Sequence, residues 1–211
     1  MTISSASGRP FDAVLCDVDN VIRFYDSSRL TELEHAAGLP EGATAEVAFA
    51  PEVDAPLMLG EIDMRQWVEA IVAAFAGRVP EERARELGEA LAASPFHADD
   101  EVVRLLRRAR AARLPLVLVT NATVELENDL AAMGLTDLAD HVVSSARVGV
   151  AKPEPKIYEI AAALAGVPME RCLFVDDTRE NVDAAVALGM TGVVYRGPAD
   201  LHPLLGGLPE R

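Results

Sequence analysis

Short apolar runs alternate with helical patterns along most of the chain, and this alternation restricts the possible folds more than any other feature. A short run without polar alternation is typical of a strand that is buried on both faces. Strands of this kind that alternate with helices form a parallel sheet covered on both sides. We therefore predict an α/β fold, a Rossmann-like parallel sheet core with helices on both faces. The runs are residues 13–16, 116–119, 142–143, 172–175 and 192–195.

Helical periodicity fills the stretches between the later runs. From Ile157 to Leu164 the apolar residues repeat at i, i+3, i+4 and i+7, and Pro155 suits a first helical turn. Thr178 is predicted to cap the next helix with its side chain, and Gly189 is predicted to end that helix.

The segment from residue 26 to 94 breaks this rhythm because it contains no convincing strand. Helices are predicted over residues 30–37, from a capping box at Asp63 and Gln66, and after Pro80. About 70 residues are too many for an ordinary strand-to-helix loop, so we expect an inserted helical subdomain. The predicted organisation is a loose N-terminal tail over 1–10, a core formed by 11–25 and 95–211, and the helical insertion over 26–94.

Composition excludes several classes of protein. The chain has 34 acidic and 19 basic residues and a net charge of −15, which opposes binding to nucleic acid. Its apolar stretches are shorter than the roughly 18 residues of a membrane span, and Met1 to Pro10 does not resemble a signal peptide. Cys16 and Cys172 are too few for a disulfide framework and are predicted to be buried, inert thiols. A cytoplasmic location with neither nucleic acid nor membrane as a partner is therefore expected.

Polar side chains follow four of the predicted strands at their carboxyl ends, the edge at which open parallel sheets bind ligands. Taken singly, each has an ordinary interpretation as a turn, a helix cap or a surface residue. Their joint occurrence at one edge is what points to a site. Lys152 adds to this signal, because the chain contains 17 arginines and only two lysines. The set is Asp17 and Asp19, Thr120 and Asn121, Lys152, and Asp176 and Asp177.

These residue types suit phosphoryl transfer. Converging carboxylates repel one another unless a cation lies between them, and carboxylate oxygens are ligands that Mg²⁺ prefers. A lysine supplies a point charge for an anion, and a hydroxyl or amide donates to phosphoryl oxygens. One aspartate can then act as a nucleophile, and a second can protonate the leaving oxygen.

The ordered set resembles the four motifs of the haloacid dehalogenase-like hydrolase superfamily, over residues 11 to 195. The residues from 148 to 158 and from 176 to 190 are similar to the branch containing the N-terminal phosphatase domain of soluble epoxide hydrolases. The motifs that carry the resemblance are DVDNV at 17–21, VTN at 119–121, KPEP at 152–155 and FVDD at 174–177.

The resemblance implies a role for each matching residue. Asp17 would be the nucleophile and a metal ligand, and Asp19 the general acid/base with its carbonyl on the metal. Thr120 and Lys152 would hold the phosphoryl group. The metal ligands would be Asp17, Asp19, Asp176 and Asp177. Substrate would also meet Asn121 and Arg23, and the insertion would be the family's mobile cap, in whose core Trp67 is expected.

The sequence therefore predicts a magnesium-dependent phosphatase that hydrolyses a small phosphorylated metabolite, as a monomer or a homodimer. The acid at Asp19 favours an oxygen leaving group, which needs a proton, over a halide, which does not. Two alternatives stay open: a phosphomutase with the same motifs, and a non-catalytic phospho-accepting or partner-binding domain.

Overall fold

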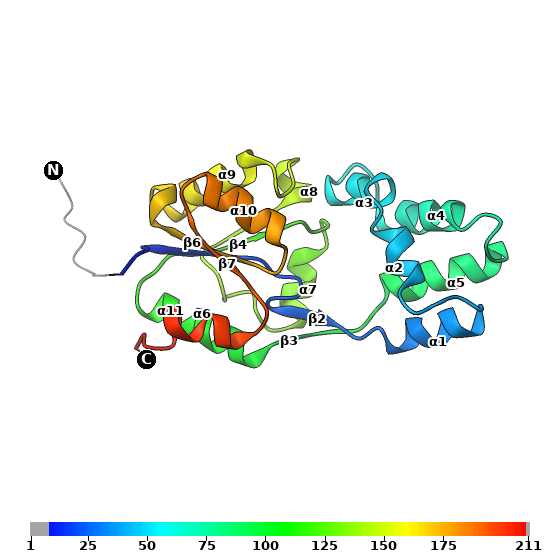
Figure 1. The fold of residues 1–211 in the computed structure, drawn as a ribbon, viewed down its shortest axis with the longest axis horizontal. Helices are drawn as coiled ribbons and strands as arrows, with labels where there is room; N and C mark the ends of the chain where they lie inside the picture. Colours follow the sequence, from blue (N-terminus) through cyan, green and yellow to red (C-terminus); the bar gives the residue numbers. More distant parts are fainter. Residues whose placement is uncertain (1–8, 210–211) are drawn as a thin grey trace.

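A five-stranded, fully parallel sheet forms the centre of the computed structural model, which describes residues 9–209 (Figure 1). Its strands are β1 (Ala13–Cys16), β4 (Leu116–Thr120), β5 (His141–Ser144), β6 (Cys172–Asp176) and β7 (Thr191–Val194). They lie in the order β5-β4-β1-β6-β7, and Leu15 of the central strand pairs with Val117 and Phe174. The predicted α/β fold and all five predicted strands are confirmed.

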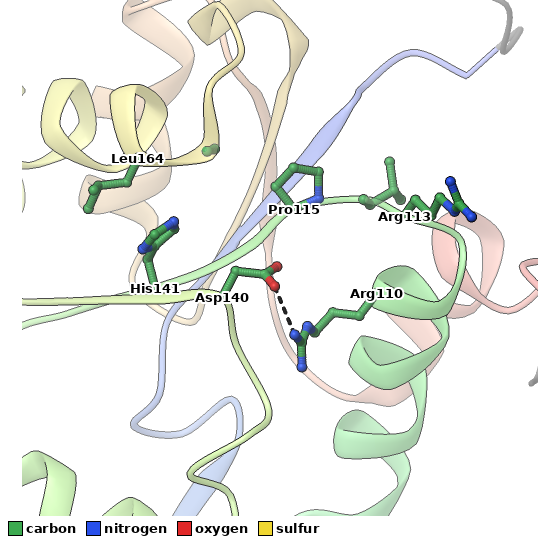
Figure 2. Close-up of a pocket in the computed structure, with 8 residues that line it drawn as sticks. Arg110, Arg113, Pro115, Asp140, His141 and Leu164 are labelled. Atoms are coloured by element: carbon green, nitrogen blue, oxygen red, sulfur yellow. Dashed lines mark hydrogen bonds and ion pairs between the residues drawn. The ribbon is translucent and has the colours of Figure 1, made fainter.

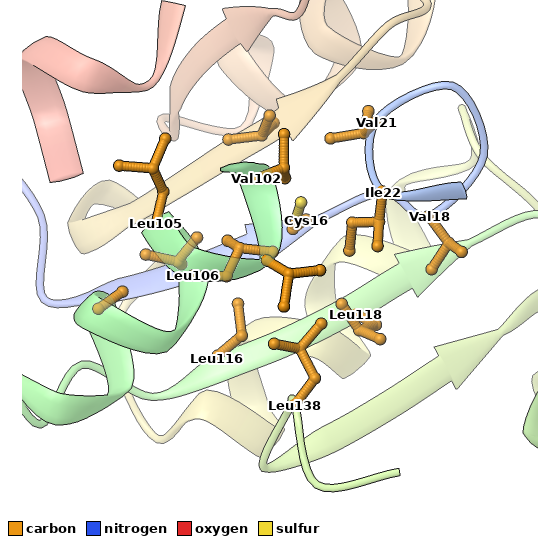
Figure 3. Close-up of a cluster of buried hydrophobic side chains, with 14 of the residues drawn as sticks. Cys16, Val18, Val21, Ile22, Val102, Leu105, Leu106, Leu116, Leu118 and Leu138 are labelled. Atoms are coloured by element: carbon orange, nitrogen blue, oxygen red, sulfur yellow. The ribbon is translucent and has the colours of Figure 1, made fainter. Parts of the chain in front are cut away.

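Helices cover both faces of this sheet, so successive side chains of β1 enter two separate apolar cores. Cys16 lies in the core shown in Figure 3, together with Leu118 and with Leu105 and Leu106 of the helix that covers this face. Leu15 points into the opposite core with Phe174. Both cysteines are free and buried, as predicted, and burial raises the pKa of Cys172 to about 11. The covering helices are α6 (Asp100–Ala111), α7 (Leu126–Ala132) and α11 (His202–Leu205) on one face, and α9 (Pro155–Ala165) and α10 (Arg179–Ala187) on the other.

The helical insertion leaves the sheet through a short antiparallel ribbon, which Figure 1 shows as the connection between the two parts of the molecule. Strand β2 (Arg23–Tyr25) pairs with β3 (Phe96–Ala98), so the outgoing and returning chains are hydrogen-bonded together. The helices of the insertion are α1 (Ser28–Ala36), α2 (Ala43–Ala48), α3 (Pro51–Met58), α4 (Met64–Ala74) and α5 (Glu81–Ala92). Trp67, Ile71 and Phe75 pack in an apolar core separate from those of the sheet.

The sequence identified only part of this insertion. The capping box of Asp63 and Gln66 is formed in both directions, at 2.7 and 2.9 Å, and it opens α4. Helices α2 and α3 and the ribbon strands were not predicted, because each is short and mixes small, acidic and proline residues. The expectation that the Thr178 side chain caps α10 is wrong. Its hydroxyl donates to Asp177 instead, while its backbone N–H donates to Asp176.

Most of the predicted N-terminal tail lies outside the described residues. Arg9 and Pro10 are described, and their carbonyl oxygens accept hydrogen bonds from Arg171. Within residues 9–209, no helix combines the length and the apolar character needed to cross a membrane.

Candidate active site

Four of the residues predicted from sequence lie together at the carboxyl edge of the sheet. Asp17 follows β1, Thr120 ends β4 and Asp176 ends β6, so the parallel register places them side by side. Lys152 reaches them from the loop between α8 (Ser145–Val148) and α9. At most 6% of each residue is exposed to solvent, which makes their interactions strong and their pairing essential.

Lys152 joins the two buried carboxylates. Its Nζ lies 2.8 Å from Oδ1 of Asp17 and 2.6 Å from Oδ2 of Asp176. Burial alone would lower the pKa of Lys152, but the two carboxylates outweigh burial and raise it, so the lysine stays charged. Burial, together with repulsion from a neighbouring acid, raises the pKa values of Asp17 and Asp176. One lysine therefore leaves this pair of carboxylates short of positive charge.

A third carboxylate completes a group that fits a divalent cation. Asp17, Asp176 and Asp177 can each place one oxygen within 4.8 Å of the other two. Among the described residues, Lys152 is the only cationic side chain paired with these three acids, so two negative charges remain uncompensated. Hard oxygen donors with excess negative charge are the chemistry that suits Mg²⁺. Magnesium therefore fits the residues that are present.

Asp176 and Asp177 have different surroundings. Asp176 accepts hydrogen bonds from Lys152, from the Thr178 backbone and from the Asn181 side chain, so both of its oxygens are occupied. Asp177 is partly exposed, and within residues 9–209 its carboxylate accepts only from the neutral side chains of Asn20 and Thr178. Asp177 is thus the less constrained of the two as a direct ligand.

Asp19 is held by Arg23, which sequence analysis predicted to bind substrate. Nε and Nη2 of Arg23 lie 2.6 and 2.9 Å from the two Asp19 oxygens, and Nη1 lies 2.6 Å from Oδ2 of Asp129 on α7. The buried guanidinium also lies over the rings of Tyr25 and Phe96, at 5.1 and 5.5 Å. These contacts occupy the guanidinium and link Asp19 to the ribbon that carries the insertion.

Thr120 and Asn121 follow the same strand but have different partners. The Thr120 hydroxyl is buried, and no described residue hydrogen-bonds to it, so it is available to a ligand. The Asn121 side chain donates to the carbonyl of Lys152 at 2.9 Å and accepts from its N–H at 2.7 Å. Asn121 therefore fixes the backbone of Lys152, a contact that its position after a strand did not reveal.

Apart from the fully buried Asp176, these residues form the floor of a cavity of about 910 Å³, whose other side is lined by the insertion. Asp17, Thr120 and Lys152 lie on the sheet side, and Asp54 and Trp67 lie on the insertion side. Asp54 and Asp129 were not identified from sequence. Each is a single acid on a surface helix, in a chain with 34 acids, and carries no local motif.

A second cavity, of about 410 Å³, lies at the opposite, amino-terminal end of the strands (Figure 2). Arg110 and Asp140 form an ion pair there at 2.8 Å, and Asp140 also accepts from the Leu116 backbone at the start of β4. Both groups are used to join a helix to the sheet. The carboxyl edge is therefore the candidate site.

Comparison with known proteins agrees with this fold. The family model for haloacid dehalogenase-like hydrolase matches residues 11–189. A phosphatase of Mycobacterium tuberculosis is 36% identical over 44% of this chain and 51% of its own length. The phosphoserine phosphatase of Thermus thermophilus is 35% identical over 58% of this chain and 51% of its own length. The chain thus spans about half the length of these two relatives.

More distant similarity extends over more of the chain. Bifunctional epoxide hydrolase 2 of Rattus norvegicus is 24% identical over 87% of this chain and 36% of its own length. A dehalogenase structure with an intermediate complex superposes with a TM-score of 0.73, over 93% of this chain and 98% of its own, at 18% identity.

A family enzyme from Bacteroides thetaiotaomicron in complex with magnesium and inorganic phosphate has a TM-score of 0.67. It covers 88% of this chain and 94% of its own, at 18% identity. These likenesses establish the shared fold, and the family match extends over most of the sequence. The chain belongs to the haloacid dehalogenase-like hydrolase family.

Proposed function

We propose that this protein is a magnesium-dependent phosphatase that hydrolyses a small phosphomonoester through an aspartyl-phosphate on Asp17. The observation that carries the proposal is the buried arrangement of Lys152 between Asp17 and Asp176, with the unpartnered Thr120 hydroxyl at the same edge. Together they offer a nucleophile, a fixed positive charge and a free donor to one phosphoryl group.

The first step is attack by Asp17 on phosphorus. Its Oδ1 accepts from the Val18 N–H at 2.8 Å and lies beside Lys152, which orients the carboxylate and leaves Oδ2 to form the new bond. The bond from phosphorus to the leaving oxygen breaks, and Asp19 gives that oxygen a proton. Thr120 and Lys152 hold the phosphoryl oxygens while the charge shifts.

The second step releases phosphate. Asp19, now a carboxylate, takes a proton from water, and the water oxygen attacks phosphorus and frees Asp17. Asp19 must loosen its contacts with Arg23 to reach a substrate, so movement of the insertion on its ribbon is part of the proposed cycle. Asp17 and Asp177 would hold Mg²⁺, with Asp176 beside them and the Asp19 carbonyl as a further ligand. When bound, Mg²⁺ would neutralise phosphoryl charge and orient the group for in-line attack.

The cavity supports hydrolysis over mutase chemistry. A phosphomutase must hold a second phosphate. Among the described residues, the only basic ones that line this cavity are Arg23 and Lys152, each already paired with two carboxylates. The similarity to epoxide hydrolase 2 supports a place near that branch as part of the same proposal. A small phosphorylated metabolite as substrate, a cytoplasmic location and a monomer or homodimer remain predictions.

A panel of phosphorylated metabolites and an aryl phosphate, assayed with and without Mg²⁺, tests the proposal. We expect hydrolysis that requires Mg²⁺ and is lost in Asp17→Asn. Asp183→Asn is the matched control, because Asp183 is exposed on α10 and outside the cavity. Turnover by Asp17→Asn at the control rate would contradict the mechanism.

A further inference from the structure

The insertion side of the cavity is larger than a phosphoryl group requires. A volume of about 910 Å³ is within the range of pockets that enclose an organic ligand. If the phosphoryl group lies against Lys152 and Thr120, the remaining space faces the leaving group. Most of the residues that line this side are apolar, and they include Phe49, Leu57, Met58, Met64 and Trp67.

Two polar atoms interrupt this apolar lining. Oδ1 of Asp54, on α3, and Nε1 of Trp67, on α4, are both buried, and neither has a hydrogen-bond partner among residues 9–209. Only 4% of Trp67 is exposed, and its ring packs against that of Phe49 at 6.3 Å. Buried polar atoms are nearly always paired in folded proteins, because an unpaired one destabilises the fold. Since both residues line this cavity, a ligand that enters it and contacts them would supply the missing partners.

The negative charge of this region restricts which functional groups that ligand can carry. The insertion contributes Glu34, Glu41 and Asp54 to the cavity lining and no basic residue. Burial raises the pKa of Asp54 to about 6, and no cation in the described part of the chain offsets this rise. A carboxylate or second phosphate on the leaving group would be repelled here, whereas an N–H or O–H donor would be attracted.

We propose that Asp54 and Trp67 form a leaving-group subsite, which selects monophosphates of largely apolar alcohols that carry a hydrogen-bond donor at their far end. An ammonium group would donate to Asp54 and supply the missing positive charge. A hydroxyl group would donate to Asp54 and accept from the Trp67 indole N–H. This inference rests on the proposed phosphatase function and adds the class of substrate.

Alkyl monophosphates of increasing length, ending in ammonium, hydroxyl, methyl or carboxylate, provide the test. At the best length, we expect kcat/KM for a donor-terminated substrate to exceed that for the methyl-terminated one by about tenfold or more. Asp54→Asn, which keeps the shape and removes the charge, should abolish the ammonium advantage. Glu52→Gln is the matched control, since Glu52 is an exposed acid of the same helix outside the cavity. The ammonium and hydroxyl arms distinguish charge pairing from neutral hydrogen bonding.

A binding measurement removes the dependence on turnover. Trp67 is the single tryptophan of the chain, so its emission reports on this subsite directly. In Asp17→Asn, the donor-terminated phosphate should change Trp67 emission and bind about tenfold more tightly than the methyl-terminated one.

Three results would overturn the subsite: equal or better use of the methyl-terminated substrate, preference for the carboxylate-terminated one, or an ammonium advantage that survives in Asp54→Asn. In each case hydrolysis itself would still stand. If the enzyme hydrolysed no substrate, not even an aryl phosphate with Mg²⁺, the proposed function would be contradicted. The binding measurement would then still test the subsite.

Discussion

The two sides of the cavity bury their carboxylates in opposite ways. On the sheet side, Asp17 and Asp176 share Lys152, and side-chain and backbone donors occupy much of what remains. On the insertion side, Asp54 is partly buried and no described residue donates to its inner oxygen. A carboxylate surrounded by fixed partners is preorganised for chemistry, whereas one without partners is available to whatever enters the cavity.

The two sides of the cavity also differ in how firmly they are attached to the rest of the chain. The sheet side is fixed by three parallel strands. The insertion is joined by the β2-β3 ribbon and touches the core again where Met58 accepts a hydrogen bond from Ser145 at 2.5 Å. The sheet side holds the reacting groups in place. The insertion, which is supported separately, can therefore select a particular substrate without changing the reaction.

The largest effect is expected from removing the shared cation of the sheet side. Lys152→Met leaves Asp17 and Asp176 buried without a counter-charge, which should lower the free energy of unfolding by about 3 kcal/mol or more. The pKa values of both acids are already above 3.8 in the folded state and would rise further. The stability that such groups contribute is present at low pH and is lost as pH rises, so the deficit should be larger near pH 8 than near pH 5.

Denaturant unfolding in the absence of divalent ions measures this difference. Lys156→Met is the control, since Lys156 is an exposed lysine paired only with Glu159. Equal stability of the two variants at both pH values would mean that Lys152 does not stabilise the buried carboxylates of Asp17 and Asp176.

A smaller effect is expected where the two sides meet, at Arg23. Arg23→Met frees Asp19 from its bidentate contact and should make that acid less well positioned. An alkoxide leaving group needs a proton and an aryl oxide needs little help. We therefore expect kcat for an alkyl phosphate to fall about tenfold more than kcat for p-nitrophenyl phosphate. Asp129→Asn, which keeps the Asp19 pair, should have a weaker effect, and a parallel fall for both substrates would argue against positioning.

The contact between insertion and core can be tested at a glycine. Gly60 has a φ of +72°, and a Cβ there would lie 2.9 Å from the carbonyl oxygen of Ala146. Gly38 has the same φ and no atom within 4 Å of such a Cβ, so it is a matched control. Both alanine variants should lose about 1 kcal/mol of stability through the left-handed backbone. Gly60→Ala should lose more stability than Gly38→Ala and should also lower kcat/KM. Equal stability and equal kcat/KM of the two variants would mean that the contact between Gly60 and Ala146 does not matter for either property.

The smallest effect should come from the insertion side, and it should have the opposite sign. Asp54→Asn removes a carboxylate whose pKa is raised from 3.8 to about 6, so the wild-type side chain destabilises the fold increasingly as pH rises between these values, and fully above them. Because Asp54 stays partly hydrated, we expect a gain of about 1 kcal/mol near pH 8, or roughly 2–4 °C in Tm, and little change near pH 4. Thermal unfolding at the two pH values measures it, and a loss of stability at pH 8 would show that Asp54 has a partner.

The sequence was informative where residues act through local patterns. Short apolar runs predicted all five sheet strands, and the polar residues after them predicted which side chains would meet, because parallel strands bring their carboxyl ends to one edge. The capping box at Asp63 was readable for the same reason.

Contacts between distant segments were not readable. Arg23 meets Asp129 across 106 positions, and Asn121 meets Lys152 across 31. No periodicity encodes such pairs. Asp54 could not be distinguished from the chain's other acids, because its importance lies in having no partner within a folded cavity.

Transfer of the phosphoryl group to Asp17 can be detected by rapid acid quenching of the enzyme during turnover of a ³²P-labelled phosphomonoester. We expect label on the peptide that contains Asp17, no label in Asp17→Asn and normal label in Asp183→Asn. Hydrolysis without label on Asp17, or with label on another residue, would contradict it.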